Sequence, residues 1–170
     1  MGKLIDDFLN LARVTRTEIH LENVDITSLA QSIPSDLRAS APQRRVDITI
    51  QPGLEARADP SLLHLSLANL FENAWKFTSK RPAARRIRTR RWQQPFHLLH
   101  SRQWRGVRSR PRRQSFWYFR RLHAATEFPG TGIGLATVQP AVQRHGGIIW
   151  AESQPNRGAT FYFTLTRGKS

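Results

Sequence analysis

The strongest constraint on the fold of this chain is a long amphipathic helix predicted for about residues 60–79. Asp59 provides an N-cap, and Pro60 stands at the first helical position, where proline is favoured. One face of the helix repeats apolar side chains with helical spacing: Leu63, Leu67, Leu70, Ala74 and Phe77. At 170 residues the chain is long enough for one domain with a single buried core, which this face should join.

A second face of the same helix gathers polar groups that are unusual beside a core. Asn69, Glu72, Asn73 and Lys76 have the spacing i, i+3, i+4 and i+7, so they share a face. The plainest interpretation is a solvated surface. The chemical interpretation is that Asn73 offers an oxygen ligand for Mg²⁺, Lys76 a charge for phosphate oxygens, and Glu72 a proton acceptor.

A glycine-rich loop near the carboxyl end can complement that face. Gly130, Thr131, Gly132 and Gly134 precede a helix predicted from Leu135 to about residue 145. Backbone N–H groups at such a helix start can hold phosphates, although the loop alone is a common pattern. Two glycines, Gly146 and Gly147, are expected to end the helix.

Strand patterns account for most of the remaining chain. Residues 46–50 alternate apolar and polar side chains, a Pro-Gly turn follows, and residues 54–57 predict a second strand. Residues 148–152 and 159–165 predict an antiparallel hairpin. Residues 24–28 run into a further helix, capped by Asp25 or Thr27, which Pro34 is expected to end or kink.

The first 14 residues predict an amphipathic helix of a different kind. Its apolar stripe comprises Met1, Leu4, Ile5, Phe8, Leu11 and Ala12, with Leu9 beside it. So strong a stripe needs a partner, which is either the body of the domain or another helix.

Taken together, these motifs resemble the ATP-binding domain of sensor histidine kinases, in the superfamily shared with DNA gyrase, HSP90 and MutL. Residues 69–78 (Asn-Leu-Phe-Glu-Asn-Ala-Trp-Lys-Phe-Thr) resemble its asparagine box. Residues 130–138, with His145-Gly-Gly and Trp150-Ala-Glu152, resemble its second glycine box and the strand that follows. Residues 1–14 resemble the end of the second dimerisation helix. The resemblance covers about residues 1–80 and 120–166.

The resemblance implies an α/β fold, an α+β two-layer sandwich with a mixed, mostly antiparallel sheet covered by helices on one face. Residues 1–20 would end the dimerisation helix, and residues 21–170 would form the ATP-binding domain. The implied cofactors are ATP and Mg²⁺. Asn73 would hold the metal, Asn69 and Lys76 would contact phosphate, and Glu72 would assist catalysis. The lid over the nucleotide would contain Gly130, Thr131, Gly132, Gly134 and Leu135.

The implied activity is transfer of the ATP γ-phosphate to a protein histidine, and then to an aspartate of a response-regulator receiver domain. The implied partners are a second copy or a partner kinase, bound through residues 1–14, and that receiver domain. The implied location is the bacterial cytoplasm, within a larger sensor protein. No apolar run approaches a membrane span, and the chain contains no cysteine.

The chain departs from the family pattern in three places. None of its six histidines has the phosphoacceptor context, so the chain is expected to begin after its substrate histidine. Pro140 interrupts the helix after the glycine loop. The Asp-x-Gly-x-Gly box, whose aspartate recognises adenine, is missing between the two motifs. This last departure predicts that the chain binds Mg-ATP poorly.

The missing box coincides with a segment of different composition. Residues 81–121 hold 14 arginines and no acidic residue, whereas the remainder nearly balances 13 basic against 12 acidic residues. Read one nucleotide later with permitted codons, residues 100–109 give Ile-Arg-Asp-Asn-Gly-Val-Gly-Phe-Asp, which is the missing box. We therefore hypothesise that about residues 85–120 are aberrant, being translated out of frame, and expect them to lack a stable packed structure.

Two alternatives from other classes stay open. The chain could be a degenerate, non-catalytic module that dimerises or binds a partner kinase through residues 1–14. It could also be a basic nucleic-acid-binding protein, with the arginines of residues 81–121 on phosphates and its tryptophans stacked on bases. Nucleotide binding separates the kinase from both alternatives, and salt-dependent DNA binding identifies the last.

Overall fold

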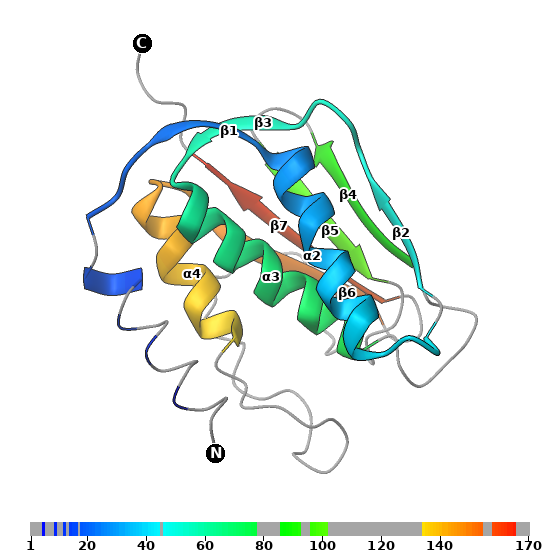
Figure 1. The fold of residues 1–170 in the computed structure, drawn as a ribbon. Helices are drawn as coiled ribbons and strands as arrows, with labels where there is room; N and C mark the ends of the chain where they lie inside the picture. The colour runs from blue at the N-terminus through cyan, green and yellow to red at the C-terminus, as the bar shows by residue number, and fades with distance from the viewer. Residues whose placement is uncertain are drawn as a thin grey trace.

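The computed structural model describes residues 5, 9, 12, 14–16, 18–44, 46–77, 86–92, 96–101, 134–154 and 158–165 (Figure 1). The helices and strands among them follow one another in this order: β1 (Glu22–Asp25), α2 (Ile26–Ser40), β2 (Asp47–Ile50), β3 (Glu55–Ala58), α3 (Pro60–Phe77), β4 (Arg86–Trp92), β5 (Phe96–Ser101), α4 (Gly134–Arg144), β6 (Ile149–Gln154) and β7 (Gly158–Thr164).

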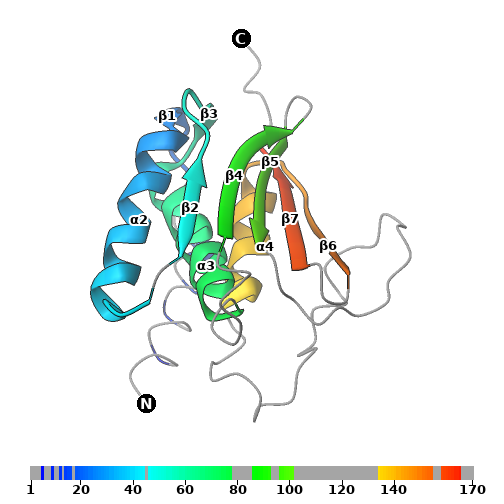
Figure 2. The same ribbon diagram turned by 90° about the vertical axis from the view of Figure 1, so that its right-hand side faces the viewer.

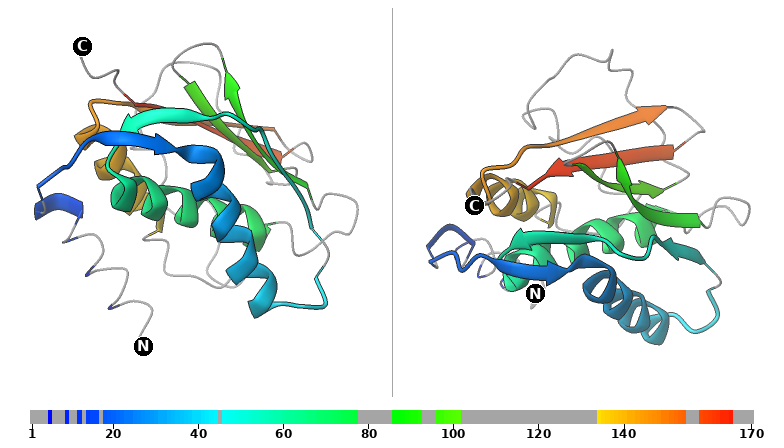
Figure 3. Two further views of the ribbon diagram at one scale, coloured as in Figure 1. Left: turned by 45° about the horizontal axis from the view of Figure 1, so that its top comes forward. Right: turned by 90° about the horizontal axis from the view of Figure 1, so that it is seen from above.

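The architecture is a sheet with helices packed on one face. The larger sheet has five strands in the order β2-β4-β5-β7-β6, with β2 and β4 parallel and the other neighbours antiparallel. Helices α2, α3 and α4 lie together on one side of it (Figures 2 and 3). A short antiparallel pair, β1 with β3, stands beside them. The predicted two-layer fold with a mixed, mostly antiparallel sheet is confirmed.

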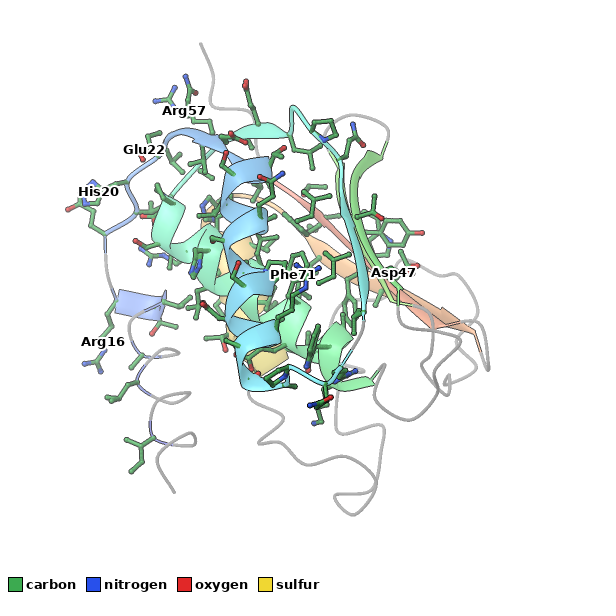
Figure 4. All side chains as sticks on the ribbon, turned by 45° about the vertical axis from the view of Figure 1, so that its right-hand side comes forward. Arg16, His20, Glu22, Asp47, Arg57 and Phe71 are labelled. Carbon is green, nitrogen blue, oxygen red and sulfur yellow. The ribbon has the colours of Figure 1, made fainter. Side chains whose placement is uncertain are left out.

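The core fills the space between the helices and the five-stranded sheet. Phe71 of α3 is fully buried there, as Figure 4 shows, whereas Arg16 and His20 lie at the periphery. The core draws on both layers, and its least exposed large side chains include Phe71, Phe163, Leu54, Leu63, Leu70, Val138 and Val142. The predicted apolar face of α3 is confirmed at Leu63, Leu67, Leu70 and Ala74. None of the helices in the described ranges is both long and apolar enough to cross a membrane.

Helix α2 begins as the sequence predicts and ends later. Asp25 is its N-cap, with Oδ1 accepting a hydrogen bond from the Ser28 amide at 3.0 Å. Of the two outcomes predicted for Pro34, an end of the helix is wrong, because α2 continues to Ser40, whereas a kink stays a prediction. Pro34 is itself buried, as are Ile33 and Ala30 beside it. Their packing against the core offsets the backbone hydrogen bond that proline removes.

The predicted strand after the Pro-Gly turn exists, and its partner is β1. Gly53 adopts a left-handed conformation at φ 69°, which glycine permits without strain. The Leu54 carbonyl then accepts from the Ile26 amide at 2.8 Å. This bond joins the turn to the start of α2 and directs β3 along β1 rather than back along β2.

The segment with the unusual composition contributes to the sheet. We expected residues 85–120 to lack packed structure, but β4 and β5 lie within it and form the middle of the five-stranded sheet. Ladder pairing uses backbone groups, which every residue except proline supplies, so arginine-rich sequence does not prevent it. Residues 102–120 lie outside the described residues, and the frame hypothesis itself stays a prediction.

The described positions of the amino-terminal segment, 5, 9, 12 and 14–16, are helical. Val14 is fully buried in a small cluster with Leu62 of α3 and Ala141 of α4. In contrast, Ile5 and Leu9 are 60% and 51% exposed. Val14, near the end of this helical segment, therefore packs on the domain body, while Ile5 and Leu9 are mostly exposed.

Candidate functional site

The site is built on α3, whose first turn is fixed by Asp59. The Asp59 carboxylate accepts hydrogen bonds from the amides of Ser61 and Leu62, both at 3.0 Å through Oδ1. Its Oδ2 accepts from the amide of His20, also at 3.0 Å. Burial acts to raise the pKa of the Asp59 carboxyl, but these N–H donors outweigh burial and hold the pKa below its ordinary value. The predicted cap is confirmed.

The polar face of α3 is open, as the sequence predicts. Glu72 is exposed, and Asn69, Asn73 and Lys76 are half-buried. The neighbouring face is buried through Phe71, Ala74 and Trp75. The four polar residues thus lie along the second half of α3, between the core and the surface.

Helix α4 runs antiparallel to α3 beside its first half (Figure 1). Leu62, near the start of α3, and Ala141, near the end of α4, belong to one buried cluster. At the far end Gly134, the first residue of α4, lies so close to Asn69 that a Cβ added to it would stand 2.7 Å from Asn69 Oδ1. Asn69 is held in place by a 3.0 Å hydrogen bond from Nδ2 to the Leu65 carbonyl. Helix α4 therefore begins next to Asn69, one turn before Asn73.

This arrangement suits an anionic ligand that binds a divalent cation. The first N–H groups of α4 carry the positive end of the helix dipole, and they start beside the face that bears Asn73 and Lys76. The Asn73 amide oxygen is a hard ligand suited to Mg²⁺, and phosphate oxygens supply the further ligands that Mg²⁺ prefers. In the described ranges no three His, Asp or Glu side chains gather into a metal site. Because Asn73 offers one amide oxygen, the residues present fit a metal whose further ligands are phosphate oxygens.

Part of the predicted glycine loop can be compared with the structure. Gly134 and Leu135 open α4 as predicted, and Leu135 packs, partly buried, against the core. Gly130, Thr131 and Gly132 lie outside the described residues. The helix runs through Pro140 to Arg144, so the prediction that Pro140 interrupts it is wrong. Val138, Ala141 and Val142, on both sides of the proline, are buried, and their packing supports the helix there.

The other end of the α3–α4 pair contains contacts that the sequence analysis missed. His145 is buried, its Nε2 accepts from the Asp59 amide at 2.9 Å, and its Nδ1 lies 2.7 Å from the Ala141 carbonyl. Arg144 donates from Nη1 to the Val14 carbonyl at 2.6 Å. We call these residues (Val14, His20, Asp59, Arg144 and His145) the junction. The available signal was a histidine directly before the helix-ending glycines.

A second overlooked residue fixes the end of α3. Arg44, in the loop after α2, stacks over the Trp75 ring at 4.6 Å and donates to the Trp75 carbonyl. A guanidinium at a helix carboxyl end satisfies carbonyls that have no partner within the helix, and it complements the dipole. Arg44 thereby steadies the turn that carries Lys76. The signal was weak, because one arginine in a loop resembles many solvated ones.

Comparison with known proteins gives a consistent result. Residues 58–169 match the family model described as histidine kinase-, DNA gyrase B- and HSP90-like ATPase. The chain is 32% identical over 168 residues to cyanobacterial phytochrome A of Nostoc sp., covering 99% of this chain and 22% of that protein. It is 28% identical to the adaptive-response sensory kinase SasA of Thermosynechococcus vestitus, covering 97% of this chain and 45% of that one.

Solved structures with a similar fold agree with the sequence comparison. Full-length ShkA, solved in complex with AMPPNP, aligns with a TM-score of 0.69 and 24% identity, covering 98% of this chain and 36% of that chain. This likeness concerns the fold alone. The chain spans about a fifth of the length of the phytochrome that it matches and under half of the sensory kinase.

Proposed function

Because the chain belongs to the family of histidine kinase-, DNA gyrase B- and HSP90-like ATPases, we propose that it carries the phosphate-binding half of a Mg-ATP site from a sensor histidine kinase. The observation that supports this most is the start of α4 beside Asn69, next to the open face with Asn73 and Lys76. The similarity to the adaptive-response sensory kinase SasA supports the histidine-kinase branch of the family.

The chain's own residues have separable roles in this proposal. Asn73 offers an amide oxygen to Mg²⁺, and Lys76 neutralises phosphate oxygens as a point charge. The exposed carboxylate of Glu72 orients the attacking group or accepts its proton. The first N–H groups of α4 bind phosphate oxygens. When bound, Mg-ATP supplies the transferable γ-phosphoryl group.

The missing Asp-x-Gly-x-Gly box limits this site to its phosphate half. An aspartate that hydrogen-bonds the exocyclic amine of adenine distinguishes ATP from GTP, and the sequence of residues 81–121 contains no aspartate or glutamate. Losing a charged hydrogen-bond partner costs about 1.5–3 kcal/mol, more than tenfold in affinity. The chain is therefore expected to bind Mg-ATP weakly and with little preference for adenine.

Titrations followed by amide NMR suit such weak binding and test the proposal. Mg-ATP, Mg-GTP and Mg-pyrophosphate should all shift the amides of Asn73, Lys76 and Leu135, with dissociation constants within about threefold of one another. Removing Mg²⁺ should weaken all three. Absence of any shift at these amides with millimolar Mg-ATP would contradict the proposal and favour the non-catalytic module.

A repaired chain provides the matched control. Replacing residues 100–109 and the segment up to residue 120 by the shifted reading should restore an adenine preference of at least tenfold. Phosphotransfer then requires a histidine substrate supplied in trans as the dimerisation helices. DNA binding that weakens steeply with salt, together with no nucleotide response, would instead favour the nucleic-acid-binding alternative.

A further inference from the structure

The ring of His145 connects the two helices of the site at the end far from the proposed ligand. It is 5% exposed, and both of its nitrogens have partners. The Asp59 amide can only donate, so Nε2 accepts; the Ala141 carbonyl can only accept, so Nδ1 carries the proton. One neutral tautomer therefore satisfies α3 and α4 together.

The residue that donates to this ring, Asp59, also has two other structural roles. Asp59 also caps α3 through its carboxylate, and it accepts from the His20 amide. The hydrogen bond to His145 thus joins the last turn of α4 to the residue that fixes the first turn of α3. Movement of α4 along α3 would break this bond.

The opposite end of α4 lies against the Asn69 side chain, so movement of α4 would change this close approach. Gly134 approaches Asn69 so closely that even a methyl group would collide with it at 2.7 Å. The intervening helix has 11 residues, about 16 Å at 1.5 Å per residue, and Ala141 in its second half is buried in a cluster with Leu62. A rigid helix held at one end determines where its other end lies.

We propose that His145 is a positioning residue for the nucleotide site, because its bond to Asp59 sets where α4 begins beside Asn69 and Asn73. This inference rests on the proposed function, since it concerns the same site. It assigns the histidine no contact with the nucleotide. Its effect is transmitted along α4 to the N–H groups that face the phosphates.

Two substitutions separate the bond to α3 from the bond within α4. His145→Asn places an amide near the position of Nδ1, so it retains a donor for Ala141 and loses the acceptor for Asp59. His145→Gln places its carbonyl oxygen near the position of Nε2, so it retains the acceptor for Asp59. If the position of α4 depends on the bond between α4 and α3, His145→Gln should preserve the site and His145→Asn should not.

The position of α4 can be measured without any nucleotide. The chain has no cysteine, so spin labels at Gln31→Cys on α2 and Ala136→Cys on α4, both exposed positions, report one distance by pulsed electron paramagnetic resonance. The parent and His145→Gln should give the same narrow distribution. His145→Asn should give a shifted or broader one. An unchanged distribution in His145→Asn would overturn the proposal.

Affinity supplies the functional measurement. His145→Asn should weaken Mg-ATP binding at least fivefold in the NMR titration, at a temperature where both chains are folded, while His145→Gln stays within about twofold. Val24→Ala, a core change on β1, controls for general destabilisation and should leave the dissociation constant unchanged. Equal weakening in Val24→Ala and His145→Asn would reduce His145 to a merely structural role.

The two readouts separate this inference from the proposed function. If the parent chain gives no response to Mg-ATP, the proposed function fails, and the spin-label distances still decide whether His145 positions α4. If the parent binds Mg-ATP and His145→Asn changes neither distance nor affinity, the inference fails and the proposed function stands.

Discussion

The two ends of the α3–α4 pair differ in what their side chains do. At the junction, hydrogen bonds join Asp59 and the end of α4 to each other and to the segment of residues 14–20. At the other end Glu72 is exposed, and Asn73 and Lys76 are half-buried on an open face. The same two helices thus carry a rigid anchor and a surface suited to a ligand, separated by the length of α4.

This difference indicates which measured quantity, stability or ligand affinity, a substitution at each end should change. A buried polar group that loses its partner destabilises the fold, because its desolvation is no longer compensated. An exposed polar group that is removed costs little stability, because water replaces it. Changes at the junction should therefore lower the free energy of unfolding, and changes at the open face should lower ligand affinity.

The largest effect is expected next to the junction, at Gly147. An alanine Cβ there would lie 1.8 Å from the Thr164 carbonyl oxygen, which belongs to the backbone of β7 and cannot rotate away. Gly147→Ala should destabilise the fold by about 3 kcal/mol or more, measured by urea denaturation. The control is Gly53→Ala, where φ is 69° and a Cβ meets nothing within 4 Å. That change should cost about 1 kcal/mol. Equal effects would contradict the contact at Gly147.

The second largest loss of stability is expected on substitution of Asp59, and it should depend on pH. Asp59→Ala removes the α3 cap and the acceptor for His20, and should cost about 2 kcal/mol near neutral pH. The carboxyl pKa is lowered in the fold, so its stabilisation is present above the unfolded value of about 3.9 and is lost as pH falls through the folded value. Acid denaturation curves should therefore fall more steeply below about pH 4 in the parent than in Asp59→Asn.

Asp25 is the matched control for that measurement. It caps α2 in the same way, through the Ser28 amide, but its side chain is exposed and its carboxylate bonds to Ser28, within the same turn. Asp25→Ala should destabilise the fold less than Asp59→Ala. A larger loss of stability in Asp25→Ala than in Asp59→Ala would show that the junction contacts of Asp59 add nothing to its role as a cap.

At the open face, a substitution should weaken ligand binding and leave the free energy of unfolding nearly unchanged. Asn73→Ala should weaken Mg²⁺-dependent ATP binding about tenfold, while its free energy of unfolding stays within about 0.5 kcal/mol of the parent. NMR titration and urea denaturation of the same sample measure both quantities. A loss of stability larger than the loss of binding energy would show that the face is structural.

The smallest effect on the isolated fold is expected at the amino terminus. Ile5 and Leu9 are mostly exposed, so Ile5→Ser with Leu9→Ser should change the free energy of unfolding by less than about 0.5 kcal/mol. The same double variant should reduce self-association in sedimentation at high concentration, if the resemblance to a dimerisation helix holds. Val14→Ser, in the buried cluster, should instead destabilise the fold.

Local signals allowed much of this architecture to be predicted from sequence. The Asp59-Pro60 cap, the alternation in residues 46–50 and the Gly146-Gly147 stop each act within a few residues. The stop is realised by hydrogen bonds from Gly146 to the Gln143 carbonyl and from Gly147 to the Val142 carbonyl, at 2.8 and 3.0 Å. The polar face of α3 also followed from spacing alone, although the roles of its residues stay predictions.

The errors share one physical cause, which is that tertiary contacts outweighed local preference. Pro34 and Pro140 lie within helices whose neighbouring side chains are buried in the core. Strands β4 and β5 pair with β2 and β7, partners that no local pattern identifies. The His145–Asp59 bond joins residues 86 positions apart, and only the folded chain brings them together.

The pairing of β5 with β7 has a consequence for how this protein is made. Phe96–Ser101 pairs with residues 159–164, so the middle of the sheet cannot close until residue 164 has left the ribosome. At about 5–20 residues per second, the edge of β5 waits roughly 3–13 s for its partner. An unpaired edge is a template for other chains during that interval. Nascent chains of this protein should therefore depend on chaperones, and premature termination before β7 should yield aggregates rather than a smaller folded domain.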